Sequence, residues 1–102
     1  MAEEVVESKE QVIMRAREKE LRGCLFKNMR LSNLQLIGAD FTDSKFESCD
    51  MDGMTLTGAN LTRVSFSRVD LRTARIDRAT LKRTTFTDCN LTEFDVSHSL
   101  LE

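Results

Sequence analysis

The chain has 102 residues, 40% hydrophobic and 31% charged, which suits one ordinary soluble domain with a single core. Its net charge of −2 gives no argument for a nucleic acid or an anionic membrane as the partner. No segment approaches the ~20 apolar residues of a membrane-spanning helix, and the acidic start Met1-Ala2-Glu3-Glu4 lacks the apolar run of a signal peptide.

The N-terminal segment has the pattern of an amphipathic helix. Within residues 3–21, Val5, Val6, Val12, Ile13 and Ala16 fall on one stripe of a helical wheel roughly 120° wide. Charged residues occupy most of the remaining surface. We predict a helix within residues 1–22, packed on a second region that begins at residue 23.

From residue 23 onward the sequence repeats every five residues. Every fifth residue from Phe26 to Leu101, sixteen in a row, is Phe, Leu, Ile, Met or Val. These types supply 32 of the 102 residues, so chance would produce the run on the order of once in 10⁸. The residues two places earlier, from Cys24 to Ser99, are small or apolar and uncharged. Two inward and three outward positions in five match neither a helix nor a flat strand.

A period of twenty is superimposed on the period of five. Phe26, Phe46, Phe66 and Phe86 are spaced by twenty. If each unit of five forms one side of a square, twenty residues close one coil and residues twenty apart stack about 4.8 Å apart. We therefore predict about four coils and a structural core ladder made of these four rings.

The units resemble those of the pentapeptide-repeat family, whose pattern is roughly Ala-(Asp/Asn)-Leu-X-X. The best matches are Ala39-Asp40-Phe41-Thr42-Asp43, Ala59-Asn60-Leu61-Thr62-Arg63 and Cys89-Asn90-Leu91-Thr92-Glu93. The resemblance implies an all-β fold, a right-handed quadrilateral parallel β-helix (a β-solenoid) over residues 23–102. Because a solenoid needs covered ends, the N-terminal helix is interpreted as a cap, with a partner-binding helix as the alternative.

Charge is banded along the repeats. Residues 63–83 carry a net charge of +5 and residues 39–52 a net charge of −4. Opposite charges twenty apart predict cross-coil ion pairs. These pairs are Asp43–Arg63, Asp52–Arg72, Arg68–Asp88 and Arg75–Asp95.

The basic band also supplies a candidate interaction belt. It consists of Arg63, Arg68, Arg75, Arg78 and Arg83. Together with Arg72, the arginines of the band are spread over all four sides of the predicted square, which disfavours a continuous phosphate-binding patch and hence a nucleic acid partner.

The last coil has no second cap in the sequence. An uncovered solenoid end exposes apolar side chains and unpaired backbone, which favours association. We expect a homodimer joined through the C-terminal coil, with a truncated chain as the alternative. The candidate dimer end is Leu91, Val96, Leu100 and Leu101.

No catalytic, cofactor-binding or metal site is predicted. His98, the sole histidine, falls at an outward position. With one histidine in the chain, a pair of nucleophile and histidine base is not expected. Cys24, Cys49 and Cys89 are odd in number and lack CxxC spacing, so they favour free thiols in a reducing compartment, the cytoplasm. Cys49 and Cys89 share a column two coils (about 9–10 Å) apart, too far for a disulfide.

These features favour a non-enzymatic protein-interaction or scaffold module whose specific role the sequence does not give. The alternative comes from the resemblance: some pentapeptide-repeat proteins mimic duplex DNA, bind DNA gyrase and confer quinolone resistance. That role implies a longer and uniformly acidic rod. Arg63, Arg68 and Arg75 interrupt three of the four sides here.

Overall fold

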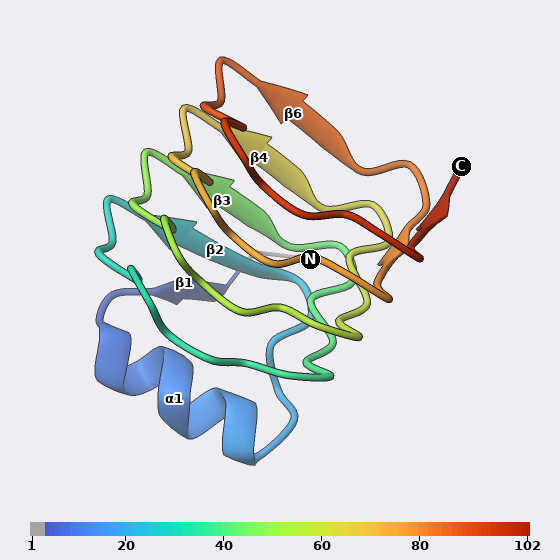
Figure 1. The fold of residues 1–102 in the computed structure, drawn as a ribbon. Helices are drawn as coiled ribbons and strands as arrows, with labels where there is room; N and C mark the ends of the chain where they lie inside the picture. Colours follow the sequence, from blue (N-terminus) through green and yellow to red (C-terminus); the bar gives the residue numbers. More distant parts are fainter. Residues whose placement is uncertain (1–3) are drawn as a thin grey trace.

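The repeats coil into a parallel β-solenoid of about five turns with one short helix (Figure 1). The computed structural model describes residues 4–102. The elements are β1 (Glu4–Val6), α1 (Lys9–Arg17), β2 (Cys24–Lys27), β3 (Lys45–Glu47), β4 (Ser65–Ser67), β5 (Thr80–Leu81), β6 (Thr85–Thr87) and β7 (Leu100–Leu101).

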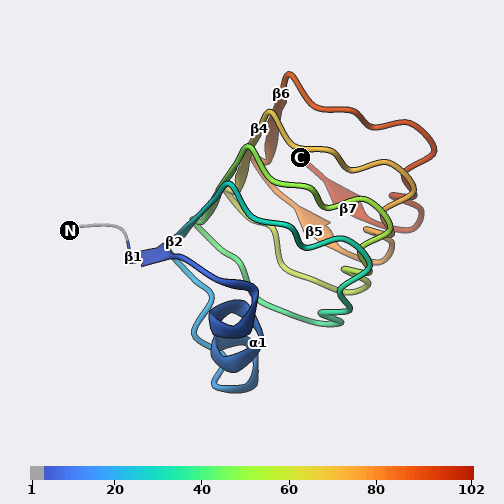
Figure 2. The ribbon, with the colours of Figure 1, turned by 90° about the vertical axis from the view of Figure 1, so that its left-hand side faces the viewer.

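Four ladders of parallel backbone pairing, all in a twenty-residue register, give the solenoid its four faces. The first face holds the sheet β1-β2-β3-β4-β6, in which Phe26 pairs with Phe46 and Phe46 with Phe66. Single bridges continue the same register around the coil (Figure 2). The second face carries Arg30, Asp50, Asp70 and Asn90, the third Gln35, Thr55, Arg75 and Asp95, and the fourth Asp40, Asn60, Thr80 and Leu100.

The N-terminal segment differs from the predicted single helix. Glu4–Val6 form strand β1, which pairs with β2 so that Val6 lies beside Phe26. The β-branched Val5 and Val6 suit a strand, and this added edge raises the expected four coils to about five. The helix begins only after Ser8, whose side chain accepts a hydrogen bond from the backbone N–H of Gln11. Residues 1–3 of the predicted helix lie outside the described residues.

Helix α1 lies against the end of the first coil, below β1 and β2 in Figure 1. Val12 on its inner side is completely buried, whereas Met14 is exposed. Leu21, in the connection that follows the helix, is also buried. It lies five residues before Phe26 and so extends the inward row of every fifth residue by one position. The short helix therefore covers the first coil with one buried stripe.

The solenoid interior is filled by the inward rows. Phe26, Phe46, Phe66 and Phe86 stack with ring centroids 4.5, 5.1 and 5.0 Å apart and nearly parallel planes. Phe41 meets the rings of Phe26 and Phe46 edge-on at 5.7 and 5.2 Å. Such stacked and edge-on contacts are the favoured arrangements of aromatic rings, so the ladder is both apolar and geometrically specific.

A residue in the left-handed backbone region follows each face and makes the corner. Every fifth residue from Gly23 to His98 has φ between 54° and 72°, yet only four of these sixteen residues are glycine. The corner N–H groups donate across coils, as from Arg63 to the carbonyl of Lys82 at 2.8 Å. These hydrogen bonds hold the backbone of the corner residues in the left-handed conformation, which costs a non-glycine residue about 1–2 kcal/mol.

Replacing a strained corner residue by glycine should stabilise the protein. Thr73 is β-branched, exposed and held at φ 56°. Thr73→Gly removes the left-handed penalty but adds unfolded-state entropy, so we expect a net gain of roughly 0.5–1 kcal/mol. The free energy of unfolding of the variant and the wild type is measured by urea denaturation monitored by circular dichroism.

Thr85→Gly on strand β6 is the matched control. Thr85 is also exposed but has an ordinary φ, so glycine there should cost about 0.5–1 kcal/mol. Equal losses in the two variants would contradict the strained-corner account.

Candidate interaction site

The belt arginines project mainly from corners. Arg63, Arg68, Arg78 and Arg83 all occupy left-handed corner positions, and Arg75 lies on the third face. Arg63 and Arg83 share the corner after the fourth face, because they are twenty residues apart. The belt therefore reaches three of the four corners of the solenoid, with Arg63 and Arg83 as its one repeated column.

Only one of the four expected cross-coil ion pairs forms. Arg63 Nε donates to Asp43 Oδ1 at 2.5 Å, and the guanidinium holds the pKa of Asp43 below its ordinary value. Arg68 instead donates to Ser48 at 3.3 Å, which corrects the predicted pair with Asp88.

The other two expected pairs are replaced by ion pairs within a coil. Arg72 pairs with Asp70 at 2.7 Å rather than with Asp52, and Arg75 with Asp77 at 3.6 Å rather than with Asp95. In both pairs the partners are two residues apart on the same coil. A guanidinium therefore reaches the carboxylate of its own coil without spanning to the next one.

Two belt arginines keep their charge available. Within residues 4–102, the side chains of Arg78 and Arg83 form no ion pair or hydrogen bond. Their backbone N–H groups are used in the corner hydrogen bonds. Arg78 and Arg83 can therefore meet an incoming carboxylate without first breaking a contact.

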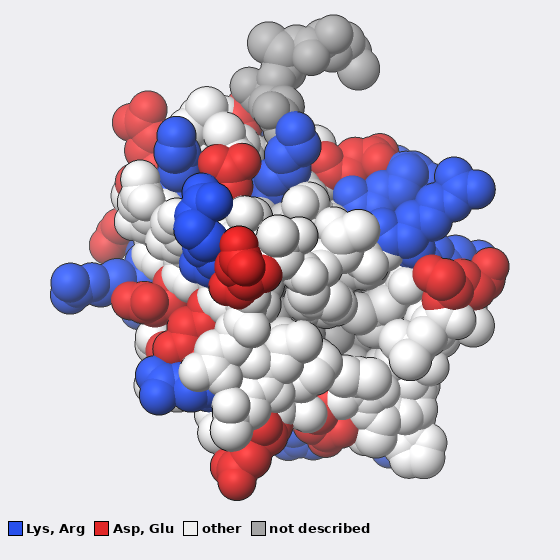
Figure 3. Space-filling view, turned by 90° about the horizontal axis from the view of Figure 1, so that it is seen from above, with Lys and Arg blue, Asp and Glu red and all other residues white. Residues whose placement is uncertain are grey.

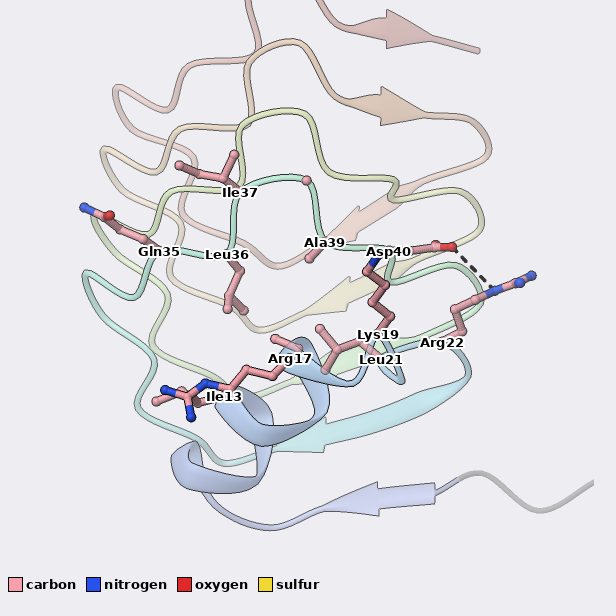
Figure 4. Close-up of a pocket in the computed structure, with 12 residues that line it drawn as sticks. Ile13, Arg17, Lys19, Leu21, Arg22, Gln35, Leu36, Ile37, Ala39 and Asp40 are labelled. Carbon is pink, nitrogen blue, oxygen red and sulfur yellow. Dashed lines mark ion pairs between the residues drawn. The ribbon is translucent and has the colours of Figure 1, made fainter.

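A groove separates α1 from the first coil (Figure 4). Its volume is about 690 Å³. The apolar lining is Ile13, Ala16, Leu21, Leu36, Ile37 and Ala39, and the basic residues at its rim are Arg17, Lys19 and Arg22. Sequence reasoning missed this groove because it exists only where a helix and a coil meet. Ile37, an isolated apolar residue at an outward position, was the one available signal.

The C-terminal coil presents the second apolar surface. Leu100 and Leu101 are 50% and 60% exposed, and Leu91 and Val96 are half-buried. Seen from above in Figure 3, uncharged surface occupies the middle of this end, with acidic and basic side chains around it. The four residues of the candidate dimer end thus belong to one exposed end surface.

The thiols and the histidine do not come together. Cys49 is buried, its Sγ lies 3.3 Å from the carbonyl oxygen of Phe26, and burial raises the pKa of its thiol. Cys89 makes the same contact with Phe66 at 3.4 Å, and His98 sits exposed at a corner. Within the described part of the chain, no three His, Cys, Asp or Glu side chains are grouped to hold a metal. No helix between residues 4 and 102 has the length and apolarity needed to cross a bilayer.

The family model described as the pentapeptide repeat region matches residues 15–76, more than half of the chain. The chain belongs to the pentapeptide-repeat family. Among solved structures, it resembles a pentapeptide repeat protein from the thylakoid lumen of Arabidopsis thaliana, with 26% identity and a TM-score of 0.67. The match covers 72% of this chain and 51% of that one, so the present chain spans about half the length of that protein. No curated protein matches the chain.

Two other solved structures match the chain less well. QnrB1, a plasmid-mediated fluoroquinolone resistance protein, shares 19% identity over 84% of this chain and 70% of its own, with a TM-score of 0.48. The pentapeptide repeat protein Rfr23 from the cyanobacterium Cyanothece 51142 shares 20% identity over 79% and 58%, with a TM-score of 0.43. Neither likeness bears on the role of the present chain.

A buried carboxylate on the third face should make stability depend on acid. Thr57 Oγ1 donates to Asp77 Oδ1 at 2.7 Å, and this hydrogen bond lowers the pKa of Asp77. Since the folded pKa lies below the unfolded value of about 3.9, the carboxylate stabilises the fold above that pH. This stabilisation is lost as pH falls through the folded pKa.

Asp77→Asn tests this dependence. The melting temperature of the wild type should drop between pH 5 and pH 2.5, and the variant should show a smaller drop, measured by circular dichroism. The control is Glu93→Gln, which alters an exposed corner carboxyl without an ion pair in the described residues. Identical drops in wild type and Asp77→Asn would refute the assignment.

Proposed function

We propose that this pentapeptide-repeat protein is a non-enzymatic protein-interaction or scaffold module that acts in the cytoplasm. The observation that carries the proposal is that the interior is filled by apolar side chains, whereas the outward side chains form regular columns along the solenoid axis. Phe26, Phe46 and Phe66 fill the centre, while the outward residues of each face repeat at the spacing of the coils. Side chains at fixed spacing on a stiff support are suited to recognition, because little conformational entropy is lost on binding.

The belt is the proposed contact region for an acidic partner surface. Arg78 and Arg83 carry free charges, and Arg63 adds a charge in the same column as Arg83. Arginine is enriched in protein interfaces because its planar group binds carboxylates in two places and stacks on aromatic rings. The free thiols Cys24, Cys49 and Cys89 support a reducing compartment.

The DNA-mimic role, with gyrase as target, has less support. A mimic of duplex DNA needs a continuous acidic face. Here the corner column that begins with Asp43 continues with Arg63 and Arg83, so the sign of the charge changes along the axis. Figure 3 likewise shows acidic and basic groups interspersed around one end.

Affinity purification from the source organism tests the interaction role. The tagged protein should enrich a specific protein identified by mass spectrometry, and Arg63→Glu/Arg83→Glu should reduce its recovery at least tenfold. Arg30→Glu/Lys27→Glu changes charge equally on the first coil and should leave recovery unchanged. Recovery that is insensitive to the belt would contradict its assignment as the contact region, and enrichment of a topoisomerase would instead favour DNA mimicry.

We also propose a homodimer joined through the C-terminal coil. Strand β6 is the last strand of its sheet and β7 the last of its pair, so each has one edge without a neighbouring strand in residues 4–102. Leu100 and Leu101 are exposed beside these edges. A second copy offers both matching apolar groups and backbone partners, which are what an uncovered sheet end lacks.

Light scattering at high protein concentration measures this association. The wild type should have the mass of a dimer, and Leu101→Asp should have that of a monomer because it places a charge in the proposed contact. Met14→Asp, on the outer side of α1, is the control for added charge at an exposed apolar residue. A monomeric wild type would rule out the dimer.

A further inference from the structure

The groove between α1 and the first coil has the properties of a peptide-binding site. We propose that it binds an acidic segment of a partner protein, with an apolar side chain on the groove floor and carboxylates at the rim. This inference rests on the proposed role as an interaction module, and it assigns a surface that is separate from the arginine belt.

The lining of the groove is largely apolar. Leu21 and Leu36 face the space from the connection and from the coil, and Ala16 adds a small side chain from α1 (Figure 4). At its edge Ile37 is 68% exposed, more than any other large hydrophobic residue in 4–102. The space beside Gly38 is open, since a Cβ built there would meet no atom within 4 Å. An apolar side chain can therefore enter without displacing the protein's own atoms.

The rim is basic and mostly unpaired. Arg17 and Lys19 form no ion pair with any residue in 4–102, and Arg22 has only a 3.7 Å contact with Asp40 between two exposed side chains. Arg17, in the last turn of α1, offsets the negative end of the helix dipole. Lys19 and Arg22 still leave positive charge facing the groove. The charge complementary to this rim is negative.

The size and chemistry of the groove favour a peptide over a nucleic acid. A volume of about 690 Å³ lies within the roughly 300–1,000 Å³ of typical ligand pockets and holds a few side chains. A nucleic acid offers phosphates but no flexible apolar group for Leu21, Leu36 and Ile37. The overall charge of −2 also opposes a long polyanion. A short segment with one or two apolar residues between carboxylates satisfies both the floor and the rim.

A phage-displayed library of random twelve-residue peptides tests the proposal directly. Selection on immobilised wild-type protein, with removal of phages that bind Ile37→Asp, should enrich peptides with apolar residues flanked by Asp or Glu. Ile37 is exposed, so this variant leaves the core intact. The most enriched peptide is then synthesised with a fluorescent label, and its dissociation constant is measured by fluorescence anisotropy.

Arg17→Glu/Lys19→Glu should weaken the labelled peptide at least tenfold, and raising the salt concentration should weaken it further. Lys27→Glu/Arg30→Glu changes the net charge by the same amount at exposed residues that line neither the groove nor the belt, and it should leave binding within twofold of wild type. Thermal melts of both variants confirm that they are folded.

Three outcomes would overturn the proposal. They are no enrichment on the wild type, enriched peptides without acidic residues, and equal weakening by Arg17→Glu/Lys19→Glu and Lys27→Glu/Arg30→Glu. Displacement of the peptide by a twelve-nucleotide oligothymidylate, with loss of oligonucleotide binding in Arg17→Glu/Lys19→Glu, would assign the groove to nucleic acid instead. The interaction role itself stands or falls separately, because purification with the belt variant does not involve the groove.

Discussion

Backbone pairing between residues twenty apart is the constraint on which the rest of this structure depends. The amide of Leu31 donates to Asp50 at 2.7 Å, and the amide of Asp50 donates back to Met29 at 2.9 Å. Repeated around four faces, this register places every side chain directly over one from the preceding coil. Like residues then stack in columns, as the phenylalanine rings do, and the repeats fill the core between the two ends.

The same pairing explains how the corners can carry charged side chains. A corner residue must adopt a positive φ, and its N–H is committed to the next coil. Its side chain, however, takes no part in this backbone pairing. Arginine at Arg78 or Arg83 costs some backbone strain but leaves the interior untouched. The charge at the corners of this fold can therefore vary without altering the packing of the core.

The two ends of the solenoid are covered differently. Helix α1 covers the first coil with a narrow stripe centred on Val12, and a cylinder laid on a four-sided coil leaves a gap along one side. That gap is the groove lined by Leu21 and Leu36. The C-terminal coil keeps Leu100 and Leu101 exposed. The apolar surfaces of this protein thus lie at or beside its ends, and the charged columns lie between them.

The sequence by itself determined the fold, the twenty-residue register and the phenylalanine ladder. It could do so because a strict period leaves little choice of which residues face inward: Phe26, Phe46 and Phe66 can only share a column. Periodicity was less informative for Val5 and Val6, whose pattern fits a helical stripe as well as a strand. Pairing with β2 decided between the two, because it supplies the backbone partners of a strand.

Only the tertiary structure decided the surface contacts. Arg72 lies twenty residues from Asp52 and two from Asp70, and side-chain reach selects Asp70. The groove required α1 to be placed against the first coil, which no repeat encodes. A periodic sequence specifies columns, because backbone hydrogen bonds fix them, but long polar side chains choose partners by local distance, and grooves arise only where two different elements meet.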